Sequence, residues 1–69
     1  MATNKTKYVI QVITFEGIRY VSAMISPSKA RLTPDITKAK KGLEKEMIGR
    51  AYMLRRNGGL NTATATPFS

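Results

Sequence analysis

The sequence predicts an α+β fold, in which an antiparallel β-hairpin packs against one long amphipathic helix (a ββα order, with the C-terminal segment as a candidate third strand). Two segments near the N-terminus, 7–15 and 18–25, are rich in the β-branched and aromatic residues that favour strands. Residues 33–56 carry apolar side chains at helical spacing. The chain has 69 residues, which is enough for a single small domain spanning 1–69.

The two predicted strands form a hairpin because a turn signal separates them. Glu16 and Gly17 lie between the strands, and glycine adopts the positive φ of tight hairpin turns without steric cost. Both faces of the hairpin are largely apolar. Because one helix covers one face only, the other face must be covered by another chain, by the tail, or by nothing.

We expect a second copy of the chain on the outer face of the hairpin, and therefore a homodimer. A domain of this size buries only about 60% of its extended surface, so a lone monomer is marginally stable. Lys7 and Arg19 could make the same face an aromatic and basic platform for nucleic acid, but its apolar area exceeds what such a platform needs. The predicted interface residues are Tyr8, Ile10, Val12, Tyr20 and Val21.

A loop is expected over 26–32, with Pro27 ending the second strand, and a helix is expected to follow it. Thr33 suits the N-cap, Pro34 suits the first helical position, and Asp35 complements the positive end of the helix dipole.

The helix is expected to run to Arg56 and to stop at Asn57-Gly58-Gly59. Gly42 and Gly49 lie inside it, and each disfavours the helix by about 1 kcal/mol relative to Ala. We prefer one helix with a kink at Gly42 over two helices that divide there, with Leu43 opening the second. The stripe that faces the core consists of Ile36, Ala39, Leu43, Met47, Ala51 and Leu54.

The two ends of the chain have less regular sequences. Residues 1–6 are polar and are expected to be flexible. Residues 61–69 alternate Thr with Ala, which is compatible with an edge strand whose threonines face water and equally with a disordered tail.

The composition excludes several classes of protein. The chain carries twelve Lys and Arg against four Asp and Glu, for a net charge of +8, and it has no His and no Cys. It therefore lacks the residues of disulfides and usual zinc sites, and a His base or Cys nucleophile for catalysis. We expect no enzyme activity, no cofactor and no small-molecule substrate. No segment has the length of a membrane span or the core of a signal peptide, so we expect a cytoplasmic protein.

The strongest functional signal is a basic face on the predicted helix. It comprises Lys38, Lys41, Lys45, Tyr52 and Arg56, which project opposite the core stripe, with Arg55 beside them. Basic side chains along a helix can contact successive phosphates, and Tyr52 can stack on a base or bond a phosphate. The competing interpretation is an ordinary solvated helix face. Lys29 and Arg31 in the preceding loop are further candidates for phosphate contact, or else belong to a solvated connector.

The order of these motifs resembles that of small accessory proteins of bacteriophages and prophages. The residues that carry the resemblance are Tyr8-Val9, Tyr20-Val21-Ser22 and the run from Thr33 to Lys41. It covers roughly residues 7–56, although Gly42-Leu43 stands where those proteins usually have an aromatic residue. The resemblance implies a phage origin, a place in the host cytoplasm, and binding to host enzymes, defence complexes or nucleic acid.

Two classes of function therefore stay open, and we favour the first. It is a small basic protein that binds nucleic acid through backbone phosphates, with DNA favoured over RNA. The second is an inhibitor or anti-defence protein that docks on an acidic host protein, a host enzyme or a nucleoprotein complex.

Overall fold

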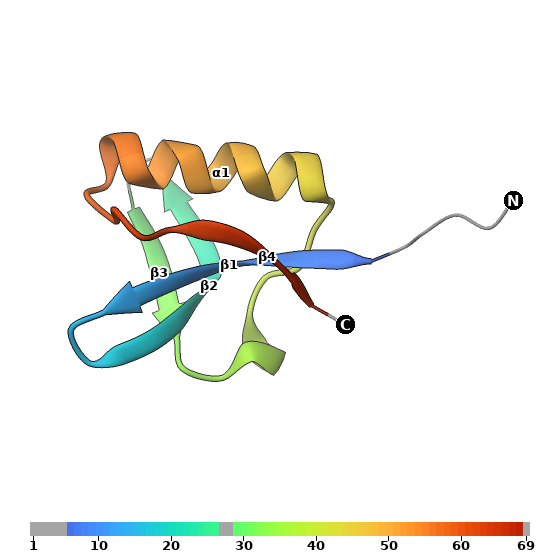
Figure 1. Cartoon of the computed structure of the whole chain (residues 1–69), viewed down its shortest axis with the longest axis horizontal. Coiled ribbons are helices and arrows are strands. Elements are labelled where there is room, and N and C mark those ends of the chain that lie inside the picture. The colour runs from blue at the N-terminus through green and yellow to red at the C-terminus, as the bar shows by residue number, and fades with distance from the viewer. Residues whose placement is uncertain (1–5, 27–28, 69) are drawn as a thin grey trace, which may run out of the picture.

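A computed structural model describes residues 6–26 and 29–68, which form one antiparallel sheet and one α-helix. The sheet contains β1 (Lys7–Thr14), β2 (Gly17–Ser26), β3 (Lys29–Thr33) and β4 (Thr64–Phe68), in the order β3-β2-β1-β4. The helix α1 (Glu44–Asn57) packs on one side of the sheet, and the 3-10 helix η1 (Ile36–Lys38) lies on the other side (Figure 1). The predicted α+β class is confirmed, but the element order is βββαβ.

The predicted hairpin is present as β1 and β2. Their register runs from Gln11 opposite Tyr20 to Thr14 opposite Gly17. Gly17 has a φ of +122°, which explains why glycine occupies the end of the turn. The Thr14 hydroxyl donates to the Gly17 carbonyl at 2.7 Å and accepts from the N–H of Glu16 at 3.2 Å, so side-chain bonds also hold the turn.

The core lies between α1 and the face of the sheet that carries Ile10, Val12 and Val21. These three side chains are at most 2% exposed, and they cluster with Met47, Ala51 and Leu54 of α1 and with Ala63. The prediction that they form a partner interface is therefore wrong, because α1 covers the face that was assigned to a second chain.

The other two residues of the predicted interface lie elsewhere. Tyr8 is half-buried at the margin of the core, and Tyr20 is opposite Gln11, which places it on the sheet face away from α1. Val9 also points to that face and is fully buried. The connector element η1 lies on this side of the sheet and contacts β2, while Ile13 and Ile18 on the same face are 56% and 48% exposed (Figure 1).

The predicted helix over residues 33–56 is interrupted. The residues expected to begin this helix precede η1 instead. Asp35 is the N-cap of η1, since its carboxylate accepts from the N–H of Thr37 at 3.0 Å. Residues around Gly42 are extended, and α1 begins only at Glu44. Leu43 is 64% exposed, so its assignment to the core stripe is wrong, whereas Met47, Ala51 and Leu54 are buried as predicted.

Backbone pairing explains the interruption. The pairing of β1 with β2 covers Gln11 to Thr14 only. On the N-terminal side of Gln11, Tyr8 exchanges backbone hydrogen bonds with Gly42 instead. The N–H of Lys40 donates to the carbonyl of Val21 at 2.9 Å, so the connector is also tied to β2. A Cβ on Gly42 would lie 2.9 Å from the Met47 Sδ and 2.9 Å from a Glu46 carboxylate oxygen, so any other residue here would force these two side chains to shift.

Strand β3 replaces most of the loop that was predicted over 26–32. Ala30 and Leu32 pack against the core and alternate with Lys29 and Arg31, as strand geometry requires. Register shifts accompany this pairing between Val21 and Ala23 and between Met24 and Ser26, so the irregularity lies in β2. Pro27, which was expected to end the second strand, lies outside the described residues.

The C-terminal segment forms an edge strand over residues 64–68. Strand β4 pairs antiparallel with β1 from Lys7 opposite Phe68 to Gln11 opposite Thr64. Ala63 and Ala65 contact the core. The expected stop after α1 is present, because the N–H groups of Gly58 and Leu60 both donate to the Leu54 carbonyl. The expected flexible segment 1–6 lies outside the described residues except for Thr6.

Candidate nucleic-acid interface

The exposed side of α1 carries a row of residues that we call the α1 ridge: Lys45, Gly49, Tyr52 and Arg56. Their spacing of four, three and four residues aligns them along the helix, opposite the buried Met47 and Leu54. All four are exposed, and Tyr52 is 48% exposed. From Lys45 to Arg56 the ridge spans about 16 Å, the length that about five nucleotides of one strand occupy in B-DNA.

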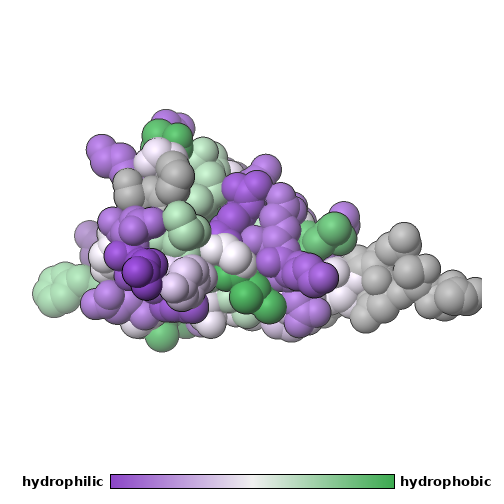
Figure 2. Space-filling model, turned by 90° about the horizontal axis from the view of Figure 1, so that it is seen from above, coloured by the Kyte–Doolittle hydropathy of each residue, from purple (hydrophilic) through white to green (hydrophobic). Residues whose placement is uncertain are grey.

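Figure 2 shows the molecule from the side of α1. Hydrophilic side chains cover much of this face, and scattered hydrophobic side chains interrupt them. The ridge itself contains no acidic residue, while Glu44 and Glu46 lie on its two flanks.

The C-terminal part of the ridge is an organised cluster. The guanidinium carbons of Arg55 and Arg56 lie 5.9 and 6.0 Å from the centre of the Tyr52 ring. Arg56 Nη1 donates to the Tyr52 hydroxyl at 3.1 Å, and Arg55 Nη1 donates to the carbonyl of Ala63 at 2.7 Å. These contacts hold two guanidinium groups beside one aromatic ring without neutralising either charge.

Two residues of the predicted basic face, Lys38 and Lys41, lie outside α1. Lys38 belongs to η1 and lies on the opposite side of the sheet from α1 (Figure 1). Lys41 Nζ donates to the carbonyls of Thr37 and Ala39, each at 3.0 Å, and lies 4.6 Å from the centre of the Phe68 ring. The interruption near Gly42 causes both displacements, because it ends the helical spacing from which the longer basic face was predicted.

Lys29 and Arg31 are exposed on β3 and are not brought together with the ridge. Their alternation with Ala30 and Leu32 directs them away from the core, whereas the ridge lies on the far side of α1. The ridge therefore retains Lys45, Tyr52 and Arg56 of the predicted set, with Arg55 at its edge.

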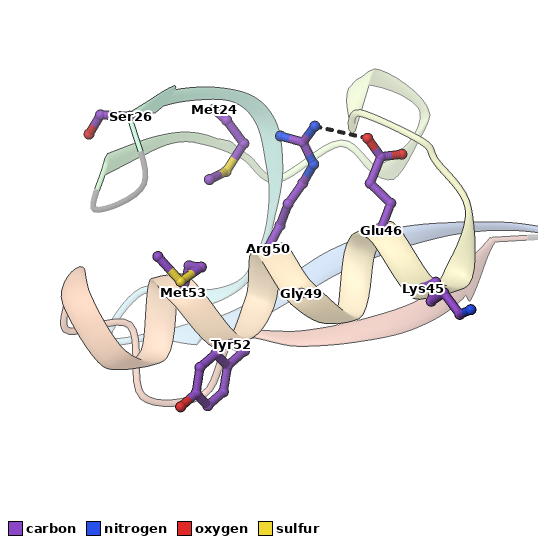
Figure 3. Close-up of a pocket in the computed structure, with 8 residues that line it drawn as sticks. All are labelled: Met24, Ser26, Lys45, Glu46, Gly49, Arg50, Tyr52 and Met53. Carbon is purple, nitrogen blue, oxygen red and sulfur yellow. Dashed lines mark hydrogen bonds and ion pairs between the residues drawn. The ribbon is translucent and has the colours of Figure 1, made fainter.

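A groove lies beside the ridge, between α1 and the C-terminal end of β2, with a volume of about 760 Å³. Figure 3 shows Met24 of β2 and Met53 of α1 pointing toward one another across it, with Arg50 and Glu46 further along the helix and Gly49 at its rim. The residues that line it are Met24, Ser26, Lys45, Glu46, Gly49, Arg50, Tyr52 and Met53. The sequence reasoning missed this groove, although Gly49 within a helix was a signal.

An ion pair occupies one end of the groove. Arg50 Nη2 donates to Glu46 Oε2 at 2.9 Å, and this hydrogen bond lowers the pKa of the Glu46 carboxyl below its ordinary value. The pair is neutral as a whole, so Glu46 subtracts little from the positive charge of the ridge. The Nε of Arg50 is shielded from solvent and has no hydrogen-bond partner within the described part of the chain.

Comparison of the chain with protein-family models, with curated proteins and with solved structures found no match. Within residues 6–26 and 29–68, no group of three acidic side chains is arranged to hold a metal ion. In the same ranges, no helix combines the length and the apolar character needed to cross a bilayer.

Proposed function

We propose that the protein binds nucleic acid through backbone phosphates, with the α1 ridge and Arg55 as the contact surface. The observation that carries the proposal is the clustering of Arg55 and Arg56 around Tyr52, in line with Lys45 and with no acid in the row. Guanidinium groups recognise phosphate oxygens in a planar, charge-assisted geometry. Tyr52 adds a hydroxyl that can bond a phosphate and a ring face that can stack.

The charge of the whole chain supports the same surface. A net charge of +8 raises the local concentration of a polyanion and accelerates encounter, while the ridge provides the short-range contacts. Three cations (Lys45, Arg55 and Arg56) release counterions on binding, which corresponds to a slope of log K against log salt of about −2.7 on a duplex and about −2.1 on a single strand.

The direct test is binding of the full chain to fluorescent duplex and single-stranded DNA and RNA across a salt series. We expect the affinity to fall with salt at a slope between about −2 and −3. An affinity that does not change with salt would show that phosphate contacts are not the mechanism.

A protein partner is the second candidate function, and the tip of the β1–β2 hairpin favours it. Phe15 is fully exposed there, and the paired Ile13 and Ile18 beside it are 56% and 48% exposed. An aromatic anchor with two aliphatic neighbours is typical of the centre of a protein interface. Capture of the same host protein after nuclease treatment by the wild type, but not by Phe15→Ser, would support this function. Equal capture by both would contradict it.

A further inference from the structure

We propose that the groove beside Gly49 receives an unstacked base of a single-stranded nucleic acid whose phosphates lie along the α1 ridge. This inference rests on the proposed function and names its substrate class. The groove and the ridge meet at Gly49, so one strand can contact both surfaces at once (Figure 3).

The shape of the groove suits a flat group. Its volume of about 760 Å³ lies within the range of small-molecule sites and exceeds what one base requires. Met24 and Met53 face each other across it (Figure 3). Methionine side chains are flexible and make favourable contacts between sulfur and aromatic rings, so two of them can close on the faces of a base.

The distribution of charge separates a base from its phosphate. Two cations line the groove. Arg50 is paired with Glu46 at 2.9 Å, and Lys45 belongs to the ridge as well, so a phosphate beside Arg50 would meet a carboxylate and no unpaired guanidinium. On the ridge, Lys45 and Arg56 have no acid between them. A neutral, polarisable group therefore fits the groove, and an anionic group fits the ridge.

Gly49 provides the passage between the two surfaces. A Cβ built on Gly49 has no atom within 4 Å, so open space lies directly above the helix backbone at this point. Glycine is unfavourable inside a helix, and nothing in the packing of the described residues requires it here. Close approach of a ligand is a physical reason for its presence.

Arg50, which lines the groove, has an Nε without a partner among the described residues. This Nε is buried, and native proteins pair nearly all buried polar groups. The edge of a base presents oxygen and nitrogen acceptors, which this N–H could reach if the Arg50 side chain turned to expose it. A base in a duplex is stacked on its neighbours and must be extruded before it can reach such a site, which is why we infer a single strand.

Binding of three probes tests the proposal: a single-stranded oligothymidylate, an oligomer of the same length with abasic sites, and a duplex. Met53→Ala removes one wall of the groove, and Ile48→Ala is the matched control, because Ile48 is an exposed apolar residue of α1 that does not line the groove. Gly49→Leu fills the passage, and thermal unfolding of each variant shows that it is folded.

We expect Met53→Ala and Gly49→Leu to weaken binding of the oligothymidylate about tenfold, which is the scale of one stacked base. Met53→Ala should bind the abasic oligomer and the duplex as the wild type does, because Met53 lines the groove and is not part of the α1 ridge, and Ile48→Ala should change none of the three. Wild-type affinity of folded Met53→Ala and Gly49→Leu for the oligothymidylate would overturn this inference and leave the proposed function standing. Failure of the wild type to bind any probe would overturn both.

Discussion

The backbones of Tyr8 and Gly42 are joined by two hydrogen bonds: the N–H of Tyr8 donates to the Gly42 carbonyl at 2.8 Å, and the N–H of Gly42 donates to the Tyr8 carbonyl at 3.0 Å. The connector near Gly42 thus pairs with β1 beyond the end of its register with β2. This pairing keeps the residues before α1 extended and separates η1 from the helix. It therefore decides which basic side chains can share one surface.

The close approach of Gly42 to the buried Met47 side chain predicts that Gly42→Ala destabilises the fold. The new Cβ would meet the Met47 Sδ at 2.9 Å, and Met47 is fully buried, so its side chain must shift within a packed core. We expect a loss of about 1–2 kcal/mol in the free energy of unfolding, measured by urea denaturation. Gly49→Ala is the matched control and should gain up to about 1 kcal/mol, because its Cβ meets nothing. Equal stability of the two variants would contradict the close approach at Gly42.

Placement of Ile10 beneath α1 predicts that Ile10→Ala costs about 2–5 kcal/mol of unfolding free energy. Its side chain is fully buried in the cluster with Met47 and Leu54. Phe15→Ala, which removes a fully exposed side chain, should change the stability by less than about 0.5 kcal/mol. If Ile10→Ala were as stable as the wild type, Ile10 would not belong to the core.

The sequence predicts local structure well where one segment determines its own conformation. The hairpin depends on strand-forming residues around Gly17, and the end of α1 depends on Asn57-Gly58-Gly59; both are confirmed. The buried stripe of α1 is likewise predicted from Met47, Ala51 and Leu54, because helical spacing is a local property.

The sequence does not predict local structure that is determined by a contact between residues far apart along the chain. Helical spacing continues through Gly42, and only the pairing with Tyr8, 34 residues away, interrupts it. The two faces of the hairpin are similarly apolar, so their sequence does not determine which one α1 covers. Val9 lies on the face away from α1 and is nevertheless fully buried, which no residue pattern in the hairpin predicts.

The candidate site likewise combines features that local sequence predicts with features that depend on distant contacts. Lys45, Tyr52 and Arg56 share one helix and keep the predicted alignment. Lys38 and Lys41 precede the interruption near Gly42, so they are not part of α1 or of the candidate site. The groove combines β2 with α1, so no single segment of the sequence could predict it.

The separation of Lys41 from the ridge predicts different effects for two substitutions that remove the same charge. Lys45→Gln should weaken nucleic-acid binding several-fold and reduce the magnitude of the salt slope by about 1. Lys41→Gln should change binding little, because Lys41 Nζ is held by Thr37 and Ala39 beside Phe68. Anisotropy titrations of both variants at several salt concentrations provide the measurement. A larger effect of Lys41→Gln would place the binding surface at the connector.

The carboxylates of Asp35 and Glu46 predict that acid destabilises the fold. Hydrogen bonds from Thr37 and Arg50 lower the pKa of Asp35 and the pKa of Glu46 below their ordinary values. Because the unfolded chain binds protons more readily, the stabilisation is present above the ordinary carboxyl pKa and is lost as the pH falls below about 4. Glu46→Gln should reduce this loss, as measured by thermal unfolding between pH 7 and pH 2. Parallel curves for Glu46→Gln and the wild type would contradict the role of the Arg50 ion pair.

The most direct test of the account compares the salt dependence of nucleic-acid binding for two double variants that remove equal charge. Lys45→Gln/Arg56→Gln removes two cations of the α1 ridge, and Lys29→Gln/Lys38→Gln removes two exposed cations of β3 and η1. We predict that the ridge variant binds at least tenfold more weakly and loses about 2 from the magnitude of the salt slope, while the other variant keeps nearly the wild-type slope. Equal losses in the two variants would show that binding follows the total charge of the protein, and would contradict a phosphate-binding site on α1.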